Sequence, residues 1–524
     1  AVLYGEMAAV KAENVFAYGE AVRLWEHTIK AQKSVDSSGL KKLCDLLLSL
    51  GDALLNEGDA KRILEIEAPR AWSLAQSIPD TDQSSRVCHL AMLALFYSGT
   101  YMSLKSPESS LWVERARNNT LPDNVAGIQA DITMGIGRCV NWDLVDGIRL
   151  LGQARESAWK TGDCDTCWWA NAMWLLFSSG YRQSDKLLET AGSLSRASQE
   201  GVGAAVLIWG FVMIADTYLD HGRRSEAEEV WHEVRKLIER YGQAQYQVFG
   251  MAGDALFATL DGELERAVEI MNQITAFGRD QEYDTLAGVL VFMIGMTPML
   301  YLGRIDNAIE YASGYSPAAE ALCLAHDDQI SKARDILTKI IDWFYPSRPD
   351  GKRQAEPGTL HPFRQVPTPT NPGDEIPVYE DTLLLQTAVL VGDIKAAELL
   401  MHRLKNCELS TTGIFHTTCI DRHLGKASEL LGKYEDALQY YRKALEVSRS
   451  MKYRPETALT SLHLAELILK HFPDDTAQAW EYLEFAVIEF REMKMKFSLE
   501  QALRNRRFFA QPNGNSNGEE TRYG

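Results

Sequence analysis

The 524-residue sequence lacks the excess of positive charge that nucleic-acid and membrane-surface proteins carry. Its 54 Lys and Arg residues are outnumbered by 72 Asp and Glu residues, which gives a net charge of −18. Such a chain repels phosphate backbones and anionic lipid and gains nothing from counterion release. We therefore expect neither a nucleic-acid partner nor a membrane partner.

Cysteine is scarce, with 8 residues that follow no disulfide framework, as is typical of a reducing compartment. The opening AVLYGEMAAVKAENVF has neither the basic start nor the cleavage site of a signal peptide. These features predict a cytoplasmic protein, and the initial Ala1 suggests a piece cut from a longer polypeptide.

Enzyme motifs are also missing. The sequence contains no GxxxxGK[ST] phosphate loop, no GxSxG nucleophile elbow and no HExxH zinc motif. We expect this chain to be no enzyme and to bind no cofactor, although its parent protein could be an ATPase or nucleotide cyclase.

Charge is absent from one long stretch, TLAGVLVFMIGMTPMLYLG, between Thr285 and Gly303. Its length would suffice to cross a bilayer. However, it contains Pro298 and has no second segment like it. We interpret it as a buried helix of a soluble fold.

Proline is sparse except in one segment, where eight of the 17 prolines fall between Pro346 and Pro377. This density excludes a helix and predicts either a linker or a long surface loop. The predicted organisation is a helical block over residues 1–345, the Pro-rich segment 346–377, a second helical block over 378–510 and a disordered tail over 511–524.

The feature that the sequence does contain is a repeat. In LGKYEDALQYYRKAL, Gly432 precedes a small, large, small series on one helical face. The small residue recurs at intervals of 40, 41, 40 and 42 residues, a period that marks stacked helical hairpins. The residues assigned to the frame are Ala215, Ala227, Trp231, Ala267, Ala308, Ala397, Gly425, Gly432, Ala437, Tyr441, Ala444 and Ala479.

This frame resembles the tetratricopeptide repeat in an elongated form. Leu424, Gly425, Ala437, Tyr441 and Ala444 match the motif, whereas Ser428 replaces its usual Tyr and Arg449 its usual Pro. The resemblance implies an all-α, right-handed α-solenoid of about eleven or twelve hairpins.

The region from Asp421 to Leu503 is also similar to the C-terminal part of bacterial signalling ATPases that carry a class III adenylate or guanylate cyclase domain or a LuxR-type regulator domain. Arg422–Gly425, Gly432–Ala444, Met451–Pro455 and Arg491–Met493 carry this similarity. It implies a sensor or protein-interaction region that follows an ATPase or cyclase module. A free-standing scaffold and a metal-dependent enzyme are the alternatives.

Two clusters have residue types that bind metal. Cys164 and Cys167 have zinc-ligand spacing without a second pair, and His416, Cys419 and His423 would share one face of a helix. Packing explains both clusters more simply, so we predict no metal site.

The inner face of the predicted solenoid is the better candidate for binding. Projection of the repeat places Trp174, Phe177, Trp209 and Asp216 on it, as anchors for a partner or as packing residues. Arg422 and Lys426 lie one turn apart and suit a carboxylate or an acidic peptide, unless they are two solvated charges. The expected partner is a protein, a peptide or a small effector.

Overall fold

The computed structural model describes residues 1–36, 38–79, 82–118, 124–180, 184–281, 283–345, 376–472 and 475–510. All regular structure in these ranges is helical, and one isolated antiparallel bridge joins Thr411 and Cys419. The predicted all-α class is confirmed. The tail 511–524 and all but two residues of the Pro-rich segment lie outside the described residues.

The helices of the first half alternate between the two arms of successive hairpins. They are α1 (Val2–Asn14), α2 (Tyr18–Val35), α3 (Leu40–Glu57), α4 (Ala60–Arg62), the π-helical turn η1 (Ile63–Glu67), α5 (Ala68–Ala75), α6 (Asp82–Leu104), α7 (Pro107–Arg117), α8 (Val125–Val140), α9 (Leu144–Thr161), α10 (Cys164–Phe177), α11 (Ser184–Leu194), α12 (Ala204–Asp220) and α13 (Arg224–Tyr241).

The second half continues the same alternation. Its helices are α14 (Ala244–Leu260), α15 (Leu264–Asp280), α16 (Asp284–Leu302), α17 (Ile305–Ala312), α18 (Pro317–His326), α19 (Ile330–Phe344), α20 (Val378–Leu390), α21 (Ile394–Leu404), α22 (Ile420–Leu430), α23 (Tyr434–Ser450), α24 (Arg454–His471), α25 (Thr476–Glu492) and α26 (Lys496–Ala510).

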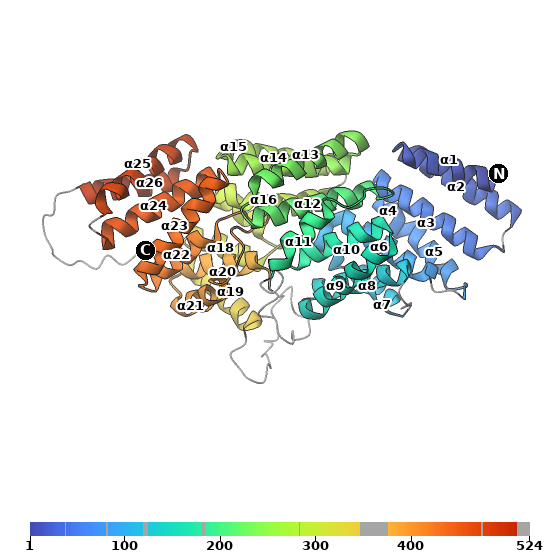
Figure 1. Ribbon diagram of the computed structural model, residues 1–524, viewed down its shortest axis with the longest axis horizontal. Helices are drawn as coiled ribbons and strands as arrows, with labels where there is room; N and C mark the ends of the chain where they lie inside the picture. The colour runs from blue at the N-terminus through green and yellow to red at the C-terminus, as the bar shows by residue number, and fades with distance from the viewer. Residues whose placement is uncertain are drawn as a thin grey trace.

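Consecutive helices pack as hairpins. Over the described residues these make twelve pairs, from α1–α2 to α24–α25, with η1 and the short α4 inside the second pair and α26 after the last. The pairs advance along the long axis from α1 at one end to α24–α26 at the other (Figure 1). The fold is therefore an all-α solenoid of tetratricopeptide-like hairpins.

The repeat frame predicted from sequence forms the contacts within and between hairpins. The small residues Ala215, Ala227, Ala267, Ala308, Ala397, Ala437, Ala444 and Ala479 are completely buried, as is Tyr441. The turn glycines of five hairpins, Gly432 among them, have φ between 68° and 78°, a region that L side chains rarely adopt. A Cβ at Gly425 would meet the Tyr441 ring, so only glycine allows this close helix contact.

The superhelix closes on itself, because the first helices of distant hairpins touch. Helix α6 packs against α16, α3 against α12, and α14 against α24. All 17 residues of α12 are therefore buried. Among the described helices only α16 is long and apolar enough to cross a membrane, but 72% of its most apolar stretch is buried in the protein. This agrees with the interpretation of residues 285–303 as a buried helix.

Candidate functional site

A loop fills the middle of the inner face of the solenoid. We call residues 405–419, between α21 and α22, the central segment. Although Ala397 and Ala437 keep the 40-residue spacing, α22 begins only at Ile420 and has 11 residues, against 17 in α12. Residues 411–419 are all buried, so this part of the chain enters the superhelix.

The central segment binds the carboxyl end of α12. The amides of Ser410 and Thr411 donate to the carbonyl oxygen of Asp220 at 2.6 and 3.0 Å. The Thr411 hydroxyl donates to the carbonyl of Leu219 at 2.7 Å. The last carbonyls of a helix have no partner within it, so these bonds satisfy α12 and hold the segment at once.

A glycine allows the closest approach to α12. Gly413 has φ of 55°, and a Cβ there would fall on the Asp216 carboxylate. That carboxylate accepts a hydrogen bond from the Ile414 amide at 2.7 Å. Burial raises the pKa of Asp216 to about 7, and burial together with Asp216 raises that of Asp220 well above its usual range.

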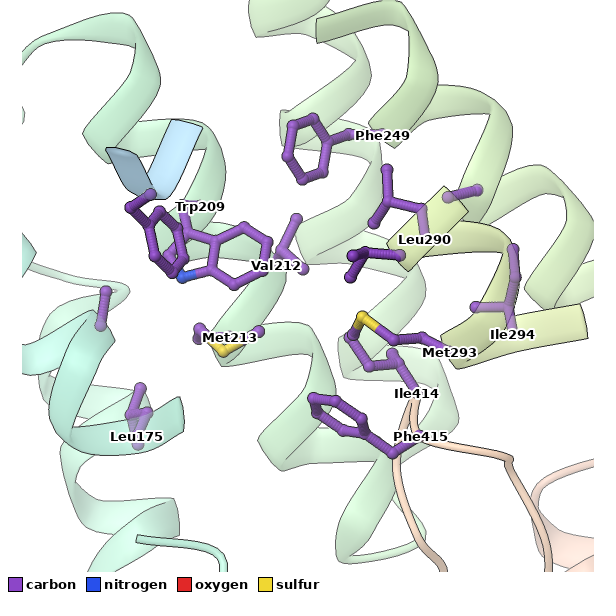
Figure 2. Packing of buried hydrophobic residues seen from close by; sticks show 14 of the residues in the cluster. Leu175, Trp209, Val212, Met213, Phe249, Leu290, Met293, Ile294, Ile414 and Phe415 are labelled. Carbon is purple, nitrogen blue, oxygen red and sulfur yellow. The ribbon is translucent and has the colours of Figure 1, made fainter. Parts of the chain in front are cut away.

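The next residues of the segment make apolar contacts. Ile414 and Phe415 lie among Met213 of α12 and Met293 of α16 (Figure 2). The Phe415 ring stacks on Tyr379 with centroids 4.8 Å apart. The inner face thus offers this segment both backbone hydrogen bonds and apolar surface.

The C-terminal end of the segment is held by a buried ion pair. Arg422 donates to Glu456 from Nε at 2.6 Å and from Nη2 at 2.7 Å, and the Thr418 hydroxyl donates to the same carboxylate at 2.7 Å. Burial would raise the pKa of Glu456, but the facing guanidinium holds it below its ordinary value. Arg422 is therefore committed to Glu456 and is not one of two solvated charges.

Lys426 lies in a more open position. It lines a cavity of about 450 Å³ on the C-terminal side of the central segment, with His463 and Gln501. Its ammonium is 3.8 Å from Glu429 and 3.9 Å from Glu466, which is longer than a hydrogen bond. Of the two predicted cations, this one retains capacity for a carboxylate.

The predicted aromatic anchors lie in the interior. Trp209 is 2% exposed and packs edge-on against Phe96 and Phe249. Trp174, also 2% exposed, is covered by a guanidinium 4.1 Å from its ring centroid. Phe177 lines a cavity of about 110 Å³. For both tryptophans the structure favours the alternative of packing.

The prediction of a shared helical face for His416, Cys419 and His423 is wrong, because helix α22 begins after Cys419. His416 lies against Phe292, and His423 Nε2 is 2.7 Å from the Thr418 hydroxyl. Cys419 Sγ donates to a backbone carbonyl instead.

The other thiol pair also lacks the setting of a metal site. Burial raises the pKa of Cys167 to about 12, which disfavours the thiolate that binds metal. Cys164 lies beside it at the start of α10. Throughout the described ranges, no group of three or more His, Cys, Asp or Glu side chains is placed to hold a metal ion.

Sequence reasoning missed the central segment, although one signal was present. The run Ser410-Thr411-Thr412-Gly413 is typical of a loop and stands directly before the position at which the hairpin frame expects a helix to begin. The partner of Arg422 gave no such signal, because Glu456 belongs to the next hairpin.

Comparison with known proteins supports the repeat assignment at one hairpin. The tetratricopeptide repeat family model matches residues 423–451, which span α22 and α23. No curated protein matches the chain.

Three solved structures align along most of the chain at low identity. The Cut9–Hcn1 hetero-tetramer of APC/C has 13% identity, with 97% of this chain and 93% of that chain covered and a TM-score of 0.47. Yeast Tom70 has 11% identity, with 98% and 97% covered and a TM-score of 0.30. A circular tandem repeat protein has 12% identity, with 96% of each chain covered and a TM-score of 0.13.

Proposed function

We propose that this chain is a non-catalytic interaction scaffold that holds an extended segment of a partner protein against its inner face. The observation that carries the proposal is the central segment itself. The inner face already holds nine consecutive buried residues, 411–419, through backbone hydrogen bonds, aromatic stacking and an ionic cluster. These are the interactions by which proteins recognise peptides.

The partner segment binds in the cavity next to the central segment, where Lys426 lies. The long distances from its ammonium to Glu429 and Glu466 leave room for a closer carboxylate. The partner therefore carries an acidic residue at this point.

Site-specific photo-crosslinking tests this placement in cells that express the full protein. A photoreactive amino acid at Gln501, which lines the same cavity and leaves the Lys426 ammonium in place, should trap one discrete protein. The same substitution at Lys433, an exposed residue in the turn before α23, is the matched control and should trap none. Equal products at both positions, or none at Gln501, would contradict the proposal.

We further propose that the chain is the regulatory region of a cytoplasmic bacterial signalling protein and follows an ATPase or nucleotide cyclase module. The similarity carried by residues 421–503 supports this.

The coding sequence upstream of Ala1 tests the signalling assignment. A continuous reading frame that encodes a phosphate loop would support an ATPase or cyclase parent. A start codon immediately upstream would contradict it and leave the free-standing scaffold.

A further inference from the structure

A second cavity, on the N-terminal side of the superhelix, has a different chemistry. It has a volume of about 690 Å³, within the roughly 300–1,000 Å³ of small-molecule sites. Helices α1, α2, α3, α6, α8, α10, α12 and α13 all contribute to its wall. We call it the N-terminal cavity.

Carboxyl groups dominate its polar lining. Asp52 is accessible from the cavity although protein surrounds it. Burial raises its pKa to about 7, against the attraction of Arg86 and with added repulsion from Asp165 and Glu13. Burial likewise raises the pKa of Asp165 to about 6. With Asp163 and Glu13, the wall has four carboxyl groups against two guanidinium groups, a formal excess of two negative charges when all four carboxyl groups are ionised.

The two guanidinium groups are already included in this balance. Arg86 is 3.1 Å from Asp45, outside the lining, and also attracts Asp52, while Arg240 lies over the Phe16 ring at 4.0 Å from its centroid. The excess of negative charge in the wall therefore has no further cation within the cavity to balance it.

A buried histidine points to a ligand that donates hydrogen bonds. His89 lines the cavity and is only 5% exposed, yet neither ring nitrogen has a hydrogen-bond partner among the described residues. Burial lowers its pKa to about 4, so the ring is neutral and one nitrogen is an acceptor. Gln129 Oε1, in the same wall, is a second buried acceptor without a described partner.

Aromatic rings form the wall next to these acceptors. Phe16 and Tyr241 pack edge to face with centroids 4.8 Å apart, and Tyr18 lies beside both. The guanidinium over Phe16 shows that this wall attracts a cation to its ring faces.

We propose that the N-terminal cavity binds an organic dication with two alkylammonium groups. Ammonium groups only donate hydrogen bonds, so they match the carboxylates and the unpartnered acceptors of the wall. Two ammonium groups also balance the formal excess of two negative charges. The aromatic wall accommodates the methylene chain between the charges. The site is separate from Lys426 and does not depend on a protein partner.

Calorimetric titration of the intact chain with 1,4-diaminobutane at pH 7.5 and 0.15 M salt tests the proposal. We expect saturable binding of one molecule per chain, and none of the neutral 1,4-butanediol. Non-saturable heats, as from diffuse attraction to the acidic surface, would overturn the proposal.

Substitutions at the wall locate the site. Asp52→Asn keeps the side-chain shape and should weaken binding at least tenfold, and His89→Leu should weaken it several-fold. Asp335→Asn on exposed α19 is the matched charge control and should leave binding unchanged. Equal affinities for Asp52→Asn and Asp335→Asn would overturn the proposal, with circular dichroism used to confirm that each variant is folded.

Two further measurements complete the test. One distinguishes a free diamine from a protein segment as the ligand, and the other separates this proposal from the proposed partner site at Lys426. Tighter binding of a capped Lys-Gly-Lys peptide than of the free diamine would support the same site with a protein segment as its ligand. Lys426→Ala should leave diamine binding intact while it removes the partner crosslink from a photoreactive amino acid at Gln501, which lines the Lys426 cavity, so either proposal can fail alone. Loss of diamine binding in Lys426→Ala would place the amine elsewhere and overturn this inference.

Discussion

The middle of the inner face and its N-terminal end both contain carboxyl groups. In the middle these groups face a segment of the chain itself, and at the N-terminal end they face a cavity. In the middle, Asp216 of α12 faces the Ile414 amide of the chain itself. At the N-terminal end, Asp52 of α3 faces a cavity of about 690 Å³. In the middle the chain itself fills the space beside the carboxyl group, whereas at the N-terminal end the wall donors, such as the Gly203 amide to Asp165, leave the space open. The same solenoid is thus packed at its centre and open at its end.

The strongest test of the packed centre removes its ionic anchor. Arg422→Leu should lower the free energy of unfolding by about 3–5 kcal/mol, because it leaves Glu456 buried without its partner. Chemical denaturation followed by tryptophan fluorescence measures the loss. The double variant Arg422→Leu/Glu456→Leu should recover most of it, and a double variant as unstable as the single would contradict this account.

The second test separates close contact from backbone conformation. Gly413→Ala should lower the free energy of unfolding by about 3 kcal/mol, since its Cβ would meet the Asp216 carboxylate. The control Gly432→Ala also has a positive φ but no atom within 4 Å of its Cβ, so it should cost about 1 kcal/mol. Hydrogen exchange of residues 411–419 should rise only in the first variant. Equal losses would show that the contact is unimportant.

The third test uses pH. The pKa of Asp216 is about 7 in the folded chain and 3.8 in the unfolded reference, so the folded chain holds a proton that the unfolded chain releases. Asp220, whose pKa is raised by burial and by Asp216, acts in the same direction, so stability should fall as pH rises above about 4 and continue to fall until both carboxyl groups are ionised.

Asp216→Asn keeps an acceptor for the Ile414 amide and should weaken this pH dependence, with a gain of about 1 kcal/mol at pH 8. Exchange protection of residues 411–419 at pH 6 and pH 8 reports it. An unchanged pH profile in the variant would exclude Asp216 as the titrating group.

The smallest effect belongs to the open end. Asp52→Asn without ligand should raise the free energy of unfolding by less than about 1 kcal/mol, because water in the cavity screens its repulsion with Asp165. The melting temperature measures this, and exchange protection of residues 411–419 should not change. A gain in stability as large as that of Asp216→Asn would mean that water is excluded from the N-terminal cavity as fully as from the middle of the inner face.

Much of the fold follows from the sequence because its contacts recur at short range. Ala437, Tyr441 and Gly425 lie within one hairpin, and their spacing alone indicates how its two helices meet. The same holds for the turn glycines, whose positive φ the frame requires. Helix α22 was harder to delimit, because the 40-residue period continues through a loop that replaces its first turns.

The candidate sites were far less predictable. The hydrogen bond from Ile414 to Asp216 joins residues 198 positions apart, and no local pattern connects them. Asp52, His89 and Asp165 come from three hairpins and share a cavity only because the superhelix turns back on itself. A projection from one hairpin identified Lys426, but it could not show that Trp209 is covered by neighbouring rings.

The sequence by itself determined the repeat, its period and the residues at which helices approach, since small side chains and glycine turns act between neighbours in the chain. Only the tertiary structure decided which part of the inner face is filled and which is open. That outcome depends on closure between hairpins such as α3 and α12, which are far apart in the chain, and on a 15-residue loop that supplies donors to buried carboxyl groups.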